Sequence, residues 1–537
     1  MRYVSVFLIC VLAFAGCKPR KSAEAASAQT HSRKVLHYGN GAEPQFIDPQ
    51  LSTGSPEQAI TRALFEGLLS RSPDGVSVAP GVAERWEVSG DKLTYTFHLR
   101  HTARWSDGKP LIAADFINSY KRMLTPGVAA DYSYMMFLVA GAEDYFNGKI
   151  KDFSETGFKA LDDYTLQIVL RQPAPYFLNA VIHHAWYPVP THVIEKFGGM
   201  SSRNTDWTRP GNFVGNGPFR LKEWHLNQRL VVEKSPTYWD KQNVRLDEIV
   251  FNPTDLADTA ERMFRAGQLD VVYEVPLSKI ATYKRERPEL LRIEPFCGVY
   301  FYRLNTARKP LDDVRVRRAL SLAIDRNSIV KNVTLGGEEP AYNFVPPGLA
   351  GFNSENKVKE DAAEARRLLA EAGYPNGTNF PKVDLLFNTL EKHRVIGEAI
   401  QQMWRKNLGI EINLYNEEWK VYLVSQKTSN YTIMRSAWIG DYADPHVFLD
   451  LWRTGGANNN TNWGDPEYDR LLDAALGSKT EEERYATYQK MEKILLDSAV
   501  VIPIYFYNYV RLIDTKVIGF HTTYLDDYPW KYVDLRE

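Results

Sequence analysis

Residues 383–414 constrain the fold more than any other part of the chain. Residues 383–387 form a short apolar run, residues 390–408 have helical spacing and stop at Gly409, and residues 410–414 alternate. A strand, a helix and a strand joined this closely form a crossover, which connects two parallel strands of one sheet. We therefore expect an α/β chain with mixed sheets, in which part of the strand pairing is parallel.

Other local patterns support a mixed architecture. Residues 57–69 have an apolar stripe at helical spacing. Two alternating segments, residues 83–86 and 93–100, are separated by a hairpin turn at residues 89–92. Thr480 and Glu483 form a capping box that predicts a helix up to about residue 496, and residues 500–507 predict a strand after it.

The chain is too long for one ordinary core. Its 537 residues predict at least two domains. The net charge of −1 offers no basic excess for a nucleic acid, so we expect no nucleic-acid partner. Aromatic residues make up 12%, a proportion that serves ligand recognition as well as packing.

The N-terminus has the pattern of a secretory signal. Arg2 precedes a short apolar run over residues 3–15, and Gly16 leads into Cys17. Residues 1–17 thus resemble a bacterial lipoprotein signal peptide, with Cys17 as the lipidated residue. An ordinary signal peptide cut nearby is the alternative. Residues 18–35 are mostly polar and predict a flexible tether, so we expect an extracytoplasmic body, periplasmic or at the cell surface, anchored by lipid.

The cysteine count leaves little room for thiol chemistry in the folded body. Cys10 lies in the predicted signal and Cys17 is the lipidation candidate, so Cys297 stands alone. We therefore expect neither an intrachain disulfide nor a thiolate metal site in the body.

The segment 435–450 (RSAWIGDYADPHVFLD) holds the strongest candidate for ligand contact. A strand rich in β-branched and aromatic residues leads to Gly440, and Asp441 follows between Trp438 and Tyr442. A carboxylate among aromatic rings at a strand end suits a cationic group on a ligand. A turn-capping aspartate is the alternative interpretation, because aspartate is common at such positions.

The sequence gives little support for a catalytic function. Asp441 and Asp444 could form a carboxylate pair for glycoside hydrolysis, but Asp444 before Pro445 is typical of a helix cap. His183 and His184 invite a metal reading, yet adjacent side chains diverge and no further ligand stands at metal-binding spacing. The chain contains no GxSxG, HExxH or phosphate-loop motif, so we expect no enzyme, no cofactor and no metal.

Four longer motifs carry a family resemblance. They are residues 93–120 (LTYTFHLRHTARWSDGKPLIAADFINSY), 215–224 (GNGPFRLKEW), 235–240 (SPTYWD) and 310–326 (PLDDVRVRRALSLAIDR). Together they resemble the peptide- and nickel-type solute-binding proteins of ABC importers, family 5, and within it the periplasmic oligopeptide-binding proteins. The resemblance extends over essentially everything after about residue 36.

The resemblance implies an architecture that the residue patterns alone do not. It implies a fold like that of the type II periplasmic binding proteins, with two lobes around a cleft and an inserted extra domain. Lobe I would comprise residues 36–70, 190–290 and 510–537. The inserted domain would comprise residues 71–189, and the second lobe, domain III, residues 291–509.

The resemblance also implies a ligand-binding set. Asp441 matches the aspartate that holds the ligand's α-ammonium. Ser436, Ala437, Trp438 and Ile439 match a segment that pairs with the peptide backbone, and Thr53, Gly54 and Ser55 match its counterpart on the first lobe. Trp419 matches a pocket wall, while His393 and Arg435 match positions at the ligand's carboxylate end.

Each of the last three has a structural alternative. Trp419 could belong to the core, His393 to a helix surface and Arg435 to a structural ion pair. The chain also departs from relatives at two positions: Gln426 stands where enteric relatives often have a basic residue, and Ile439 where some have a cysteine that could pair with the position of Cys297.

The function implied is that of a monomeric, lipid-anchored binding protein that passes oligopeptides to ABC permease subunits. Other cargo for the same fold would be a murein peptide, a dipeptide, a nickel chelate or a sugar oligomer. A sensor or pheromone receptor shares the fold class. A secreted hydrolase is the alternative from another class.

Overall fold

The predicted crossover is present. Strand β14 (Val383–Asn388), helix α11 (Glu391–Leu408) and strand β15 (Ile412–Glu417) follow one another, and the two strands pair in parallel from Val383 opposite Ile412 onward. The helix ends at Gly409, whose φ of 70° lies in the left-handed region that glycine adopts without strain. Residues 383–414 therefore fold as their pattern predicts.

The computed structural model describes residues 33–73, 77–478, 480–521 and 523–536. The predicted signal peptide, Cys17 and the tether up to residue 32 lie outside the described residues. Val35, the last residue of the predicted tether, already belongs to the first strand, β1. From Lys34 onward the chain forms one unit. Within the described ranges, no helix combines the length and apolarity needed to cross a bilayer.

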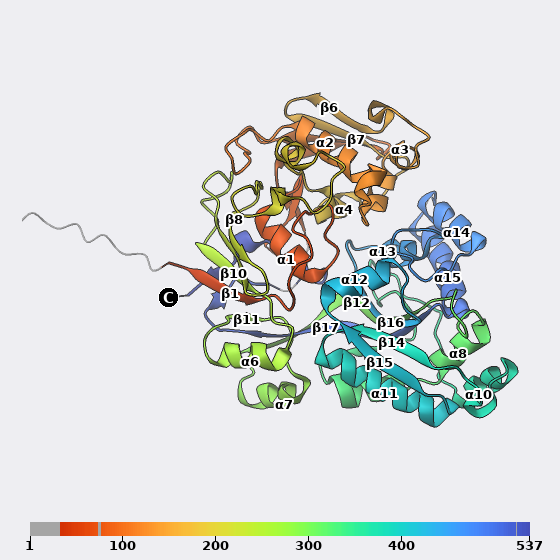
Figure 1. The fold of residues 1–537 in the computed structure, drawn as a ribbon. Helices are drawn as coiled ribbons and strands as arrows, with labels where there is room; N and C mark the ends of the chain where they lie inside the picture. Colours follow the sequence, from red (N-terminus) through yellow and green to blue (C-terminus); the bar gives the residue numbers. More distant parts are fainter. Residues whose placement is uncertain (1–32, 74–76, 479, 522, 537) are drawn as a thin grey trace, which may run out of the picture. The chain divides into compact units, whose positions relative to one another are not determined.

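One mixed sheet runs through this unit and carries most of its strands (Figure 1). Its order is β15-β14-β16-β12-β17-β11-β1-β10-β9-β8, and β13 pairs with β17 off this path. The further members are β1 (Val35–Gly39), β8 (Phe219–His225), β9 (Arg229–Lys234), β10 (Glu248–Asn252), β11 (Val271–Val272), β12 (Leu291–Leu304), β13 (Glu339–Pro340), β16 (Ile433–Ile439) and β17 (Val501–Ile513).

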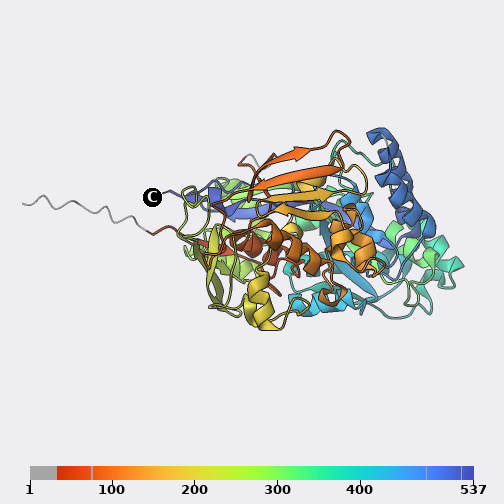
Figure 2. The same cartoon turned by 90° about the horizontal axis from the view of Figure 1, so that it is seen from above.

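A second sheet has four antiparallel strands in the order β4-β5-β7-β6. They are β4 (Ala83–Val88), β5 (Thr94–Leu99), β6 (Phe158–Asp162) and β7 (Thr165–Val169). The hairpin predicted at residues 89–92 joins β4 to β5. All four strands fall within residues 71–189, the range predicted for the inserted domain, and the orange and gold ribbons of this region lie together in both views (Figures 1 and 2). The predicted domain boundaries themselves stay a prediction.

The remaining elements are helices and two small strand pairs. The strand pairs are β2 (Leu69–Arg71) with β3 (Val78–Pro80) and β18 (Val517–Ile518) with β19 (Asp534–Leu535). The other helices are α1 (Ser55–Leu64), α2 (Ala113–Met123), α3 (Ala142–Phe146), α4 (Phe177–Ala180), α5 (Thr191–Ile194), α6 (Ala257–Arg265), α7 (Leu277–Glu286), α8 (Val314–Leu322), α9 (Arg326–Ile329), α10 (Ala362–Glu371), α12 (Trp419–Lys427), α13 (His446–Leu449), α14 (Pro466–Leu476) and α15 (Glu481–Ser498).

Two predicted element ends differ from the structure. The helix expected over residues 57–69 ends at Leu64, because Phe65 is extended and the Gly217 amide donates to the carbonyl of Leu64. The strand expected to end at residue 507 continues to Ile513 as β17. The polar side chain of Arg511 does not end the strand, because it is buried and pairs with Asp526 at 3.2 Å.

A buried ion pair fastens α2 to the loop after β1. Arg122 Nη2 lies 2.7 Å from Asp48 Oδ2, and both side chains are buried. The same guanidinium also donates to carbonyls of the segment at Met200 and Ser202. Since α2 covers the four-stranded sheet, this pair connects the region of that sheet to the first strand of the large one.

We predict that Arg122→Ala lowers the free energy of unfolding by about 3–5 kcal/mol, because it leaves the Asp48 carboxylate buried without its partner. Guanidinium denaturation followed by circular dichroism measures this. Lys149→Ala is the matched control: its pair with Asp144 is exposed, so the unfolding midpoint should not change measurably. Equal midpoints for the two variants would contradict the prediction.

Candidate functional site

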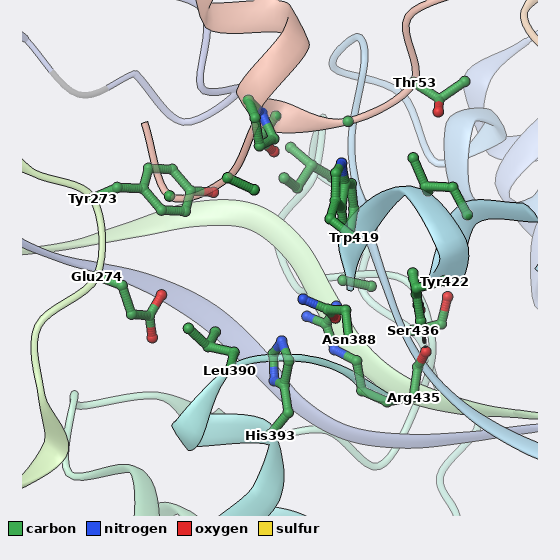
Figure 3. Close-up of a pocket in the computed structure, with 18 of the residues that line it drawn as sticks. Thr53, Tyr273, Glu274, Asn388, Leu390, His393, Trp419, Tyr422, Arg435 and Ser436 are labelled. Carbon is green, nitrogen blue, oxygen red and sulfur yellow. Dashed lines mark hydrogen bonds between the residues drawn. The ribbon is translucent and has the colours of Figure 1, made fainter. Parts of the chain in front are cut away.

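A cavity of about 240 Å³ lies between two groups of residues, one that precedes β12 in the sequence and one that follows it. Helix α1 and the loop before it line one side, and β16, α11 and α12 line the other. Figure 3 shows Thr53 on one side of the cavity, His393 and Arg435 on the other, and Trp419 between them. All of the ligand-contact residues predicted from sequence line this cavity: Thr53, Gly54, Ser55, His393, Trp419, Arg435, Ser436, Ala437, Trp438, Ile439 and Asp441.

One edge of β16 is open at the cavity. Along one side β16 pairs with β12 over its whole length, Ile433 to Ile439. Along the other side it pairs with β14 only at Ile433 and Met434. Residues 436–439 therefore present backbone groups to the cavity with no strand beside them. Such an edge accepts an extended chain as an added strand.

The opposite wall also offers unpaired backbone. Within the described residues, neither the amide nor the carbonyl of Thr53 makes a hydrogen bond, whereas the carbonyl of Gly54 accepts from Gln58 in the first turn of α1. Gly54, which follows Thr53 and caps the helix, is extended, and Pro56 occupies the first turn. The two walls together could hold the main chain of a ligand from both sides.

Asp441 lies at the end of this open edge, and its carboxyl group lacks a partner. The side chain is 6% exposed, and Oδ2 has no hydrogen-bond partner among the described residues. Burial raises the pKa of Asp441 to about 7, although the imidazole of His184 opposes this rise. A buried carboxylate without a donor is costly, so this position calls for a cationic hydrogen-bond donor.

The nearest basic side chain, His183, does not supply that donor. His183 Nε2 lies 3.1 Å from Asp441 Oδ1, close enough for an ion pair, but the orientation makes no hydrogen bond. Burial lowers the pKa of His183 to about 3 and lowers that of His184 as well. Both imidazoles are therefore neutral near pH 7, and the close approach is not an ion pair.

The other polar residues around Asp441 have structural contacts of their own. Asp444 accepts the amide of His446 at the start of α13 and pairs with Arg484 at 3.0 Å, so it acts as the cap that its sequence predicts. In the described part of the chain, no three His, Cys, Asp or Glu side chains gather at metal-binding distance. His183 and His184 pack their rings together, with centroids 4.0 Å apart.

Arg435 and His393 sit at the other end of the open edge. Arg435 donates to Asn388 Oδ1 at 3.1 Å and to the Tyr507 hydroxyl at 2.6 Å, and its Nε has no partner among the described residues. No acidic side chain pairs with it there, so the structural ion pair considered from sequence is absent within the described ranges. His393 is buried, and burial lowers its pKa well below the usual value.

Trp419 closes the cavity against the first wall. Its indole nitrogen donates to Glu57 Oε1 at 3.3 Å, and its ring stacks on Tyr422. Gly54 allows this approach, since a Cβ there would lie 2.6 Å from the Trp419 ring and 2.3 Å from Glu57. Trp419 is thus a wall residue that contacts both sides.

Sequence reasoning missed the charged residues that line the cavity, Arg303, Lys392, Glu274 and Asp255, and Glu57 beside it. Glu57 is buried at the start of α1, where its sequence position reads as an ordinary first-turn acid. Arg303 is 1% exposed on β12 and lines the cavity. The one available signal for Arg303 was a charged residue directly after an aromatic run, Tyr300 to Tyr302, that predicts a buried strand.

Comparison with known proteins now decides the family. Residues 77–460 match the model of bacterial extracellular solute-binding proteins, family 5. The chain belongs to this family. It is 36% identical over 507 residues to the periplasmic oligopeptide-binding protein OppA of Salmonella typhimurium, with 92% of this chain and 91% of that protein covered.

Solved structures agree with this assignment. The Escherichia coli murein tripeptide binding protein MppA superimposes with a TM-score of 0.90 at 34% identity, covering 94% of this chain and 99% of that one. Haemophilus influenzae OppA in complex with the peptide RPPGFSPFR gives 0.89 at 32% identity, covering 94% and 99%. The fold is that of the type II periplasmic binding proteins, as the resemblance implied.

This family 5 protein is in a closed arrangement. The unliganded open form of MppA gives a TM-score of only 0.63 at 35% identity, covering 94% of this chain and 97% of that one. Contacts between residues before β12 and residues after it agree: Lys427 Nζ lies 2.6 Å from Asp131, and the rings of Tyr176 and Tyr442 stack at 4.7 Å. The contact of Trp419 with Glu57 belongs to the same closed set.

We predict that a free-amine peptide binds most tightly between about pH 7 and about pH 8. Below pH 7 Asp441 gains a proton, so pairing with an ammonium must expel it, and affinity should fall by roughly tenfold per pH unit. Above about pH 8 the peptide's own α-amine loses its charge. His183 and His184 stay neutral throughout this range because their pKa values are lowered.

Isothermal titration calorimetry from pH 5 to 9 measures this dependence. An N-acetylated version of the same peptide is the control, because it has no ammonium and its weaker binding should not vary in this way. Constant affinity of the free-amine peptide from pH 5 to 7 would contradict the assignment of the titration to Asp441.

We predict that Gly54→Ala weakens ligand binding at least tenfold and changes the unfolding midpoint much less. Gly54 has φ of −103°, which alanine adopts freely, and the end of the Glu57 side chain must turn aside in either state, whereas the clash of the added Cβ with the Trp419 ring arises across the closed cavity. Calorimetry and thermal unfolding measure the two effects. Gly90→Ala, where nothing lies within 4 Å, is the control, and equal affinities for both variants would refute the closure role.

Proposed function

We propose that this protein captures oligopeptides in the closed cavity and delivers them to the permease of an ABC importer. The observation that carries the proposal is Asp441: a buried carboxyl group with an unpartnered oxygen, at the end of an open strand edge. An extended peptide with a free α-ammonium supplies both missing partners, a strand for the edge and a cationic donor for the carboxylate.

The other cavity residues take the roles that follow from their positions. Ser436, Ala437, Trp438 and Ile439 pair with the peptide main chain from one side, and the segment 53–55 does so from the other. Trp419 forms the wall over the ligand. Arg435, with a buried unpartnered Nε, and His393 receive the carboxylate end.

Backbone pairing and terminal charges explain how one cavity serves many sequences. Main-chain hydrogen bonds do not depend on side-chain identity, so affinity comes largely from the extended backbone. This supports oligopeptides rather than a sugar oligomer or a nickel chelate as cargo, because neither offers a strand to the open edge. Within peptides, the absence of a cation at Gln426 leaves Arg435 and His393 as the groups for the carboxylate.

The proposed protein works outside the cytoplasm. Residues 1–17 act as a lipoprotein signal, Cys17 carries the lipid, and residues 18–35 tether a monomeric body to the membrane. The family assignment supports an extracytoplasmic solute-binding role without catalysis, cofactor or nucleic acid. Its partners are the peptide and the permease subunits.

We predict that Asp441→Asn weakens binding of a free-amine tetrapeptide by at least a hundredfold. The asparagine retains the shape but removes the charge that holds the ammonium, a loss of about 3–5 kcal/mol for a buried pair. Calorimetry with the peptide and its N-acetylated form tests this in both proteins. The wild type should distinguish the two peptides strongly and the variant weakly.

Asp450→Asn is the matched control, because Asp450 is another aspartate of the same stretch but does not line the cavity. Equal affinity of the wild type for free and acetylated peptide would refute the assignment of Asp441. Mass spectrometry of ligands that copurify with the protein identifies the cargo directly, and recovery of non-peptide ligands alone would refute the oligopeptide proposal.

A further inference from the structure

Arg303 is a buried cation in the cavity wall, and no acidic side chain among the described residues neutralises it. Its Nε donates to Ser436 Oγ at 3.0 Å, and Nη1 donates to the carbonyl of Asn458 at 2.6 Å and to Asn460 Oδ1 at 3.4 Å. Its guanidinium carbon lies 5.4 Å from the ring centroid of Trp452. All of these partners are neutral.

Several buried arginines of the described residues are paired with an acid, whereas Arg435 and Arg317, like Arg303, bind neutral groups. Arg122 pairs with Asp48 at 2.7 Å, Arg511 with Asp526 at 3.2 Å, and Arg326 approaches Glu360 at 3.7 Å. A buried charge is ordinarily paired in this way, because removing it from water is costly. Arg303 is buried with neutral hydrogen-bond partners alone.

The guanidinium is also incompletely bonded. Arginine carries five N–H donors, and within the described residues Nη2 of Arg303 donates to none of its neighbours. Arg303 lines the cavity together with Ser436 and Asn458. Burial lowers the pKa of Arg303, but guanidinium groups remain charged at any physiological pH. The two N–H groups of Nη2 therefore remain available to a ligand.

The charges of the cavity show what is missing. Glu338 and Glu274 lie beside Lys392, at 3.1 Å and 3.7 Å, and neither of them pairs with Arg303. In the proposed function, Asp441 takes the peptide's ammonium and Arg435 its terminal carboxylate. Arg303 then remains without a counter-charge even when a peptide with free termini and uncharged side chains is bound.

We propose that Arg303 is a specificity-determining residue that selects peptides with an acidic side chain, aspartate or glutamate. The inference rests on the proposed function, since it assigns a preference to the same site. A carboxylate accepts charge-assisted hydrogen bonds from the two N–H groups of Nη2, and the pair forms within the cavity that Arg303 lines. The carboxylate gains charge-assisted hydrogen bonds while Arg303 gains its missing counter-ion.

The test is a positional series of tetrapeptides in which glutamate or glutamine replaces each residue of tetra-alanine in turn. Calorimetry with the wild-type protein should show that glutamate binds at least tenfold more tightly than glutamine at one internal position. The absence of an internal preference for glutamate would overturn the proposal.

Variants assign the preference to its residue. In Arg303→Gln the glutamate-to-glutamine affinity ratio at that position should fall to within about twofold. Arg317→Gln is the matched control, since Arg317 is a buried arginine that binds carbonyls and does not line the cavity, and the ratio should stay as in wild type. A preference that persists in Arg303→Gln overturns the proposal.

Two further comparisons keep the outcome decisive. Where Arg303→Gln does not fold, Arg303→Lys retains the charge but loses the planar guanidinium. The glutamate-to-glutamine affinity ratio should then fall while remaining above one. Tetra-alanine distinguishes the two proposals. If it binds the wild type while its acetylated form does not, the proposed function holds. If glutamate then gives no gain in affinity over glutamine, only the proposed preference for acidic side chains fails. Failure of tetra-alanine itself to bind would count against the proposed function.

Discussion

The antiparallel pairing of β12 with β17 is the interaction on which the rest of the structure depends. Beyond it lie β11, β1 and their neighbours on one side and β16, β14 and β15 on the other, so the two parts of the large sheet meet through these strands. The pairing has register shifts between Pro295 and Val299 and between Tyr300 and Phe301. Phe296, within the first irregular stretch, lines the cavity. The junction that joins the two walls thus also allows a change of direction between them.

Side chains of opposite charge lie at the two ends of β16, the strand that lines the cavity. Asp441 follows the last residue of β16, and Arg435 lies near its beginning. Both are buried, and neither has an opposite charge bound to it within the described residues. A zwitterion of extended shape is complementary to this arrangement, because it brings a positive group to one end and a negative group to the other. Charge and backbone pairing then select for the same class of molecule.

Local patterns predicted elements whose stabilising contacts are close in sequence. The crossover of β14, α11 and β15, the hairpin at residues 89–92 and the cap at Thr480 all appear as expected. The end of α1 could not be predicted, since Gly217 packs onto Leu64 from 153 positions away. The extension of β17 likewise depends on a partner for Arg511 that the pattern of residues 500–507 does not contain.

The same division holds for the site. Family resemblance pointed to the residues that gather in the cavity, and the acid at Asp441 stood out among aromatic neighbours. Burial raises the pKa of Asp441, and the residues close to it in the fold include His183 and His184, which are more than 250 positions away in sequence. Arg303 was overlooked because a charged residue in a strand is ordinarily exposed or paired. Only the contacts of the folded chain distinguish it from a structural arginine.

The unpartnered carboxyl of Asp441 also bears on when the protein closes. Raising a pKa from 3.8 to about 7 corresponds to about 4 kcal/mol for the ionised group, roughly a thousandfold in an equilibrium constant. An empty cavity that closes at neutral pH therefore carries an energetic penalty, whereas one that closes around an ammonium does not. The acid thereby disfavours closure without cargo at and above neutral pH, whereas below pH 7 a protonated Asp441 allows the empty cavity to close, and a ligand then has to displace that proton.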